Sequence, residues 1–89
     1  MIIENKLYYN QLFDIYGELL TNKQKEVYEY YFFDDLSIIE IATILDVSKI
    51  AVYNNIQKSL KKLDLYEREI GYLELLEKYQ KLKRGTSEI

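Results

Sequence analysis

The stretch LTNKQKEVYEYYFFDDLSIIEIATILDVSKIAVYNNIQKSLKKL, residues Leu20–Leu63, decides the fold of this 89-residue chain. Within it, Thr21 is followed three residues later by Gln24, and Ser37 is followed three residues later by Glu40. In such a capping box the hydroxyl accepts a hydrogen bond from a backbone N–H of the first helical turn, and the Gln or Glu side chain accepts one from the cap residue. The stretch therefore predicts that one helix starts at each box.

The box at Thr21 predicts a helix to about Phe33, and the acidic pair that follows ends it. The box at Ser37 predicts a short helix with a buried stripe of three residues: Ile41, Ala42 and Leu45. Residues 46–48 then form a turn, and Ser48 caps a longer helix. The inner face of that helix follows the helical period and consists of Val52, Ile56, Ser59, Leu60 and Leu63.

The short helix, the turn and the long helix are predicted to form a helix-turn-helix. Ala42 is small enough for the two helices to approach closely. The turn bends sharply and needs a left-handed residue, and since no glycine is present we expect Asp46 to adopt that conformation. The alternative is a helical bundle in which the caps occur by coincidence.

The flanking segments are also predicted to be helical. Apolar residues at helical spacing indicate a first helix over about 4–19, weakened near its end by Gly17. The phase of the apolar pattern changes at Gly71, which indicates a break before a fifth helix that ends near Lys83. We therefore expect an all-α protein of about five helices. Residues 1–70 would form the helix-turn-helix domain, with the motif itself at 37–63. Residues 71–84 would form a C-terminal helix for packing or dimerisation, and residues 85–89 a frayed tail.

The composition excludes several classes of function. The chain has neither Cys nor His, so it lacks disulfides, thiolate ligands and the commonest general base and zinc ligand. We expect no catalytic site, no metal site and no cofactor, and therefore a non-enzymatic protein. No apolar run approaches the roughly 18 residues of a membrane span, and the N-terminus does not resemble a secretion signal. These features predict a cytoplasmic protein.

The net charge of −3 is unevenly distributed along the chain. Residues 26–46 carry six carboxylates and no Lys or Arg, whereas residues 48–63 carry four lysines and no acid. Such a distribution gives no overall attraction to nucleic acid but places positive charge on one helix.

The chain resembles region 4 of bacterial sigma factors, and more closely the YlxM family of small proteins from low-GC bacteria. The resemblance is carried by LTNKQ at 20–24, YFFDDLS at 31–37 and VSKIAVYNNI at 47–56. The tail around Tyr66-Glu67 and LEKYQ at 76–80 is similar as well. The resemblance implies a sigma region 4-like helix-turn-helix fold. Family members are usually encoded beside the genes of the signal recognition particle and its receptor, which implies that the protein takes part in that pathway or regulates it.

The outer face of the long helix is the candidate site for nucleic acid. Asn54 or Gln57 could pair with adenine, and Ile50 could contact a thymine methyl group. The lysines could contact phosphates, one of them at the helix N-terminus, where backbone N–H groups favour an anion. The full set is Lys49, Ile50, Tyr53, Asn54, Gln57, Lys58 and Lys61. The alternative is an ordinary solvated helix face.

The acidic segment before this helix argues against tight binding of DNA by a monomer. Other helix-turn-helix proteins contact the phosphate backbone with that region, and we expect a non-specific Kd on the order of 10⁻⁴ M or weaker. The apolar stripe of the C-terminal helix predicts a homodimer, and the alternative is that this helix folds back onto the first. Two further partners remain open. One is a structured RNA such as that of the signal recognition particle. The other is a protein contacted through exposed aromatic residues, expected at Tyr30, Phe32 and Phe33.

Overall fold

The computed structural model describes residues 5–87, and over this range the chain forms five α-helices and one 3₁₀ turn, with no strand. The expected all-α fold is confirmed. The elements in order are α1 (Lys6–Tyr16), η1 (Gly17–Leu19), α2 (Asn22–Phe32), α3 (Ile38–Leu45), α4 (Lys49–Ile70) and α5 (Tyr72–Ser87).

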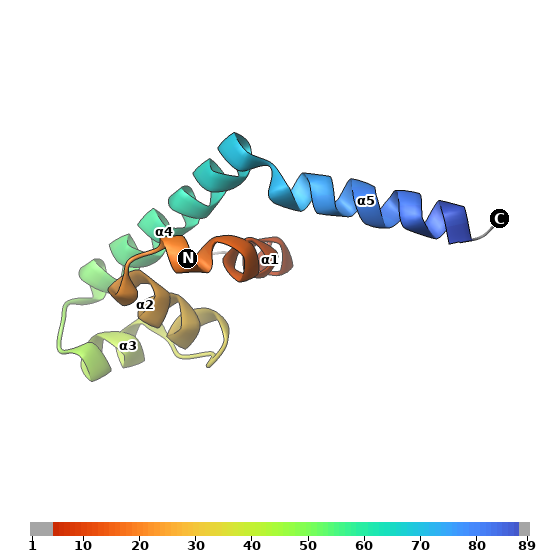
Figure 1. The fold of residues 1–89 in the computed structure, drawn as a ribbon. Helices are drawn as coiled ribbons and strands as arrows, with labels where there is room; N and C mark the ends of the chain where they lie inside the picture. The colour runs from red at the N-terminus through yellow and green to blue at the C-terminus, as the bar shows by residue number, and fades with distance from the viewer. Residues whose placement is uncertain (1–4, 88–89) are drawn as a thin grey trace.

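α4 is the helix on which the others assemble. α1, α2 and α3 each pack against it, while α5 continues away from its C-terminal end (Figure 1). Val52, Ile56 and Leu63 project from one face of α4 and are almost completely buried. They form a single apolar core with buried residues of the other helices, among them Leu12 of α1, Val27 and Tyr28 of α2, and Ile41 of α3.

The predicted helix starts are confirmed. At Thr21 the hydroxyl accepts from the N–H of Gln24 at 3.1 Å, and the Gln24 amide oxygen accepts from the N–H of Thr21 at 3.1 Å. Ser37 and Glu40 form the same reciprocal pair at 3.1 and 3.0 Å. The Ser48 hydroxyl accepts from the backbone three residues later at 3.0 Å. Each cap satisfies N–H groups that a helix start leaves without an intrahelical partner.

The turn between α3 and α4 has the predicted left-handed residue. Asp46 has φ 54° and ψ 49°, and the N–H of Val47 closes the end of α3 by donating to the Ala42 carbonyl at 3.0 Å. A second left-handed residue, Asp35 with φ 55°, redirects the chain after α2. Aspartate tolerates left-handed backbone angles better than most residues, so Asp35 and Asp46 occupy turn positions at which glycine is the usual residue.

The expected first helix over 4–19 is corrected at its end. α1 stops at Tyr16, and residues 17–19 tighten into a 3₁₀ turn in which the N–H of Leu20 donates to the Gly17 carbonyl at 3.0 Å. Gly17 itself is buried, and a Cβ atom there would lie 3.2 Å from the ring of Phe13. A side chain at this position would require the Phe13 ring to move by a few tenths of an ångström. Residue 4, the expected start, lies outside the described residues.

The predicted break at Gly71 is confirmed, because this residue adopts a left-handed conformation with φ 71° and ends α4. The expected end of the fifth helix near Lys83 is wrong, since α5 runs to Ser87 and includes part of the segment expected to be frayed. No proline stops the helix, and a glycine at position 85 costs only about 1 kcal/mol relative to alanine. Residues 88–89 of that segment lie outside the described residues.

Glu67 fixes the start of α5. Its carboxylate accepts hydrogen bonds from the N–H groups of Leu73 and Glu74, both at 3.1 Å, and from the Tyr16 hydroxyl at 2.7 Å. The Tyr16 oxygen in turn accepts from the N–H of Tyr72 at 3.1 Å. Partial burial opposes ionisation of Glu67, but these three hydrogen bonds outweigh it and hold the pKa of Glu67 below its ordinary value. One side chain of α4 thus ties α1 to α5.

Only the beginning of α5 packs on the body of the protein. Leu73 is buried, whereas the rest of the helix projects beyond α1 (Figure 1). The C-terminal helix was alternatively expected to fold back onto the first helix. Only the first turns of α5 contact α1 in this way.

Substitutions of Asp46 test the left-handed turn. Asp46→Val should lower the free energy of unfolding by about 2 kcal/mol, because a β-branched residue is strained at positive φ. Asp46→Gly should leave the free energy of unfolding within about 1 kcal/mol of that of the original protein. Relief of backbone strain is offset by the greater conformational freedom of the unfolded chain. Urea unfolding measures both values. Equal stability of the two variants would contradict the left-handed conformation.

The cap at Glu67 predicts a pH-dependent stability. Since the pKa of Glu67 is lowered by folding, its contribution is present above the ordinary value of 4.5 and is lost as the pH falls through the folded value. Glu67→Gln should therefore destabilise the protein at pH 7 and have much less effect at pH 3, as measured by urea unfolding. Glu69→Gln, on the exposed side of the same turn, is the matched control and should show little difference between the two pH values. A Glu67→Gln effect of the same size at both pH values would refute the charged cap.

Candidate nucleic-acid interface

The seven residues predicted to read nucleic acid all lie on α4, between its first residue, Lys49, and Lys61. The buried face of the same helix is directed into the core, so most of these side chains occupy its outer side. Gln57 is half-buried, and the other six are exposed: Lys49, Ile50, Tyr53, Asn54, Lys58 and Lys61. Six of the seven share the side of α4 that faces away from the core: Ile50, Tyr53, Asn54, Gln57, Lys58 and Lys61. Lys49 lies apart from this face, exposed at the helix start beside the Ser48 cap.

The fourth lysine of this segment has a different role. The Lys62 ammonium group donates to the Gln24 amide oxygen at 3.1 Å, the same oxygen that takes part in the capping box of α2. Lys62 is half-buried and joins α4 to α2. Lys49, Lys58 and Lys61 are therefore the lysines of this segment that extend outward.

The outer face of α4 is more apolar than a surface that contacts nucleic acid usually is. Ile50 keeps 72% of its surface exposed, and Tyr53 is exposed beside it on the helix. Large apolar side chains are costly to leave in water unless something covers them, and a group of them often marks a contact surface. A thymine methyl group, a nucleobase or an apolar protein side chain would each fit this chemistry.

A groove between α3 and α4 adjoins the outer face of α4, and the sequence pattern did not predict it. It has a volume of about 550 Å³ and is lined by Ile39, Ala42, Thr43, Asp46, Val47, Ser48 and Lys49. Ile39 and Val47 are exposed there, and Ile44 is exposed elsewhere on α3. The sequence did indicate an unusual surface on α3, because Ile39 and Ile44 lie outside its buried stripe, at positions where polar residues are expected. No Lys or Arg occurs on α3.

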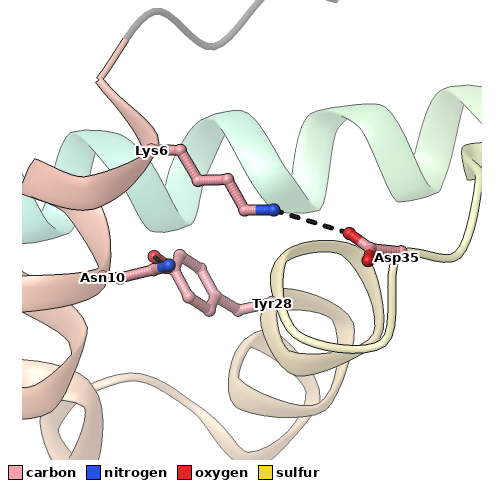
Figure 2. A network of polar contacts seen from close by, with 4 residues as sticks. All are labelled: Lys6, Asn10, Tyr28 and Asp35. Atoms are coloured by element: carbon pink, nitrogen blue, oxygen red, sulfur yellow. Dashed lines mark hydrogen bonds and ion pairs between the residues drawn. The ribbon is translucent and has the colours of Figure 1, made fainter.

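The acidic segment is partly neutralised by cations from outside it. The Lys6 ammonium group of α1 lies 3.5 Å from the Asp35 carboxylate, and Lys23 lies 3.2 Å from Glu26 (Figure 2 shows the first pair). Both pairs are exposed to solvent and contribute little to stability. Glu40 is engaged in its capping box, which lowers its pKa through hydrogen bonds from the Ser37 backbone and side chain. The remaining three carboxylates, Glu29, Asp34 and Asp46, are exposed.

Among these acids, Asp46 is the one that lines the groove beside the start of α4. It lies in the turn immediately before the outward lysine of the α4 N-terminus, and it lines the groove together with Lys49. A phosphate approaching this helix end would meet both charges. The N-terminal end of the candidate surface is therefore electrostatically mixed, and the purely basic part begins at Lys58.

The proposed protein-binding aromatics require one correction. Phe32 is only 3% exposed and stacks on Tyr28 with ring centroids 4.2 Å apart. Residues four apart share a face of an α-helix, so Phe32 follows Tyr28 into the core. Tyr30 is half-buried, and Phe33 is exposed at the end of α2 while its ring lies near that of Phe13. The expected exposed aromatic surface is thus reduced to Phe33 and part of Tyr30.

The same region shows how α1 supports α2. The Tyr28 hydroxyl donates to the Asn10 side-chain oxygen at 2.7 Å, close to the Lys6–Asp35 pair (Figure 2). Burial raises the pKa of Tyr28, so this group stays a neutral donor. These contacts position α2 against α1.

Among residues 5–87 there is no cluster of three or more acidic side chains able to hold a metal ion. In the same range, no helix combines the length and the apolar content needed to cross a bilayer.

Comparison with known proteins identifies one family over nearly the whole chain. Residues 3–89 match the UPF0122 family, described as "Putative helix-turn-helix protein, YlxM / p13 like". A UPF0122 protein of Listeria welshimeri is 44% identical over 80 residues, which cover 90% of this chain and 70% of that protein. One of Shouchella clausii is 42% identical over 88 residues, covering 99% and 78% respectively. One of a Thermoanaerobacter strain is 36% identical over 83 residues, covering 89% and 71%.

Proposed function

This chain belongs to the UPF0122 family of YlxM/p13-like helix-turn-helix proteins, and on that basis we propose that it is a small, non-enzymatic regulatory protein that binds nucleic acid through the outer face of α4. The observation that carries the proposal is the group of exposed polar and basic side chains on α4, directly after the left-handed turn at Asp46. A helix-turn-helix presents its second helix to the major groove in this way.

Within this proposal the residues divide by chemistry. Asn54 and Gln57 supply amide groups of the kind that pair bidentately with adenine, and Ile50 supplies a methyl-bearing surface for thymine. Lys58 and Lys61 contact phosphates, which hold the helix in place without reading sequence. Lys49 adds a further phosphate contact at the N-terminus of α4, where the helix dipole favours an anion.

The affinity of one copy should be low. Three exposed lysines neutralise few phosphates, and the Asp46 carboxylate of the turn lines the same groove as Lys49, so we expect a non-specific Kd on the order of 10⁻⁴ M or weaker. The proposal therefore includes a homodimer formed through the C-terminal helices, which doubles the number of contacts. It also places the protein in the cytoplasm, where nucleic acids and the signal recognition particle are found.

A second candidate is a protein-interaction module, or an RNA-binding accessory of the signal recognition particle, that has lost autonomous binding to DNA. The groove between α3 and α4 favours it, because Ile39 and Val47 are exposed where a DNA-binding protein would place cations. The shallow minor groove of RNA needs fewer phosphate clamps than duplex DNA, so α4 alone could contact it. The YlxM resemblance supports a link to the particle through the genes encoded beside it.

Charge reversal on α4 tests the proposal. Lys58→Glu with Lys61→Glu should reduce binding of random duplex DNA or of signal recognition particle RNA at least 10-fold at low salt, since two of three phosphate contacts are replaced by repulsion. Fluorescence anisotropy over a range of salt concentrations measures the affinity. For the original protein, log affinity should fall with log salt with a slope of about −3 or shallower for each copy bound.

The matched control is Lys6→Glu with Lys23→Glu, which changes the net charge equally at exposed positions on α1 and α2. It should bind nucleic acid with nearly the affinity of the original protein. An equal loss in both variants would mean that net charge alone governs binding, and the outer face of α4 would not be the site. Binding only to the protein subunit of the particle, unaffected by salt, would favour the second candidate instead.

A further inference from the structure

α5 carries an exposed apolar surface on the opposite end of the molecule from α3 and the start of α4. It consists of Tyr72, Leu75, Tyr79 and Leu82, here called the C-terminal stripe, with 48%, 63%, 60% and 72% of their surfaces exposed. The intervals of three, four and three residues are those of the seam between two paired helices. A helix pair is therefore the arrangement that this spacing fits.

The stripe faces away from the rest of the protein. Leu73 is buried and Leu76 is half-buried, so the opposite side of α5 makes the contact with α1. Beyond its first turns, α5 projects as a single helix with open space around it (Figure 1). A second helix could lie along the stripe without displacing any element of the fold.

The charges of α5 are segregated along its length. Its first turns carry Glu74 and Glu77, and the part from residue 78 onward carries four cations: Lys78, Lys81, Lys83 and Arg84. Lys78 lies 3.2 Å from Glu74 of the same helix, so the two signs meet there. A parallel pair would bring the basic part of one helix beside the basic part of the other. An antiparallel pair brings the acidic part of each helix closer to the basic part of the other, and it also opposes the two helix dipoles.

We propose that the C-terminal stripe binds a second copy of this chain, with the two α5 helices antiparallel. This specifies the arrangement of the homodimer included in the proposed function, and it does not require that nucleic acid be bound. In the register centred on Glu77, Leu75 lies opposite Tyr79 of the partner subunit, and Tyr72 lies opposite Leu82 of the partner subunit. On one flank of the seam, Glu74 then lies at the level of Lys81 of the partner subunit and within one turn of Lys78 of the partner subunit.

The pair is expected to be in exchange with monomers. Four side chains on one helix face bury well below the roughly 800 Å² per partner of a standard interface. The Kd for dimer formation should therefore be on the order of micromolar or weaker, and it should rise with salt, because the flanking charges are exposed.

The arrangement has a consequence for the reading face on α4. Each chain is elongated, with extents of 56 × 24 × 20 Å, and α5 and the helix-turn-helix occupy opposite ends (Figure 1). An antiparallel pairing through α5 puts the two reading faces at the far ends of the dimer, farther apart than the roughly 34 Å of one turn of duplex DNA.

Cysteine cross-linking tests the direction of the pairing, because the natural chain contains no cysteine. Leu75→Cys and Tyr79→Cys proteins are mixed in equal amounts and oxidised, and the products are identified by mass. The antiparallel register predicts that the mixed 75–79 dimer dominates and that Leu75→Cys alone cross-links poorly. Efficient cross-linking of Leu75→Cys to itself would indicate a parallel pair. That result would overturn this inference while leaving the homodimer of the proposed function in place.

Charge exchange provides a second test on the full-length protein. The triple variant Glu74→Lys, Lys78→Glu and Lys81→Glu should dimerise with itself in sedimentation velocity but form few mixed dimers with the original chain at low salt, since Glu74 then faces Glu at 78 and 81. Leu75→Glu with Tyr79→Glu should be monomeric with an unchanged helical circular dichroism spectrum, because both side chains are exposed. A monomer for the original chain up to the millimolar range would overturn both the inference and the homodimer. The anisotropy measurements on α4 would still test the binding of nucleic acid independently.

Discussion

Burial of the inner face of α4 is the interaction on which the rest of the structure depends. Val52, Ile56 and Leu63 are each almost inaccessible to solvent, and α1, α2 and α3 all pack on the helix that carries them. A core of this size in a short chain gives a small margin of stability, so few of these contacts can be lost. Because α4 is held along one face, its other face is presented at a fixed orientation, which is the condition for any recognition by it.

The local features of the sequence predicted the fold well, because they are satisfied within a few residues. Both capping boxes, the Ser48 cap and the breaks at Asp46 and Gly71 each depend on hydrogen bonds or backbone angles spanning less than two turns. The helix ends were predicted less accurately, because fraying and 3₁₀ turns at a helix end depend on small differences in free energy. α1 ended early at Tyr16, before a 3₁₀ turn, and the glycine at position 85 did not end α5.

Features that join distant parts of the chain were not predictable from spacing. The contact of Glu67 with Tyr16 and the start of α5 spans 51 residues, and that of Lys62 with Gln24 spans 38. Helical periodicity placed the seven candidate residues on one helix face, yet it could not show that Gln57 is half-buried or that Phe32 turns into the core. Those outcomes depend on which neighbouring helix lies against each position. The groove between α3 and α4 could have been anticipated in part, because Ile39 lies outside the buried stripe of α3, but its shape depends on how α3 lies against α4.

The placement of charge limits the shape of nucleic acid that this fold could accept under the proposed function. A straight duplex lying along both helices of the motif would meet Lys49, Lys58 and Lys61 on α4, but also the carboxylate of Asp46 in the turn. Electrostatic repulsion from the carboxylate in the turn falls off within about 8–10 Å at physiological salt. A ligand that contacts α4 only beyond its first turn therefore largely avoids this repulsion. The fold therefore favours a narrow contact, such as a bulge, a loop or the shallow groove of an RNA helix, over an extended DNA operator. Asp46 has a structural reason to be present, since its left-handed turn sets the angle of α4. Under the proposed function, the acid that would repel a long duplex is thus the same residue whose left-handed turn orients α4.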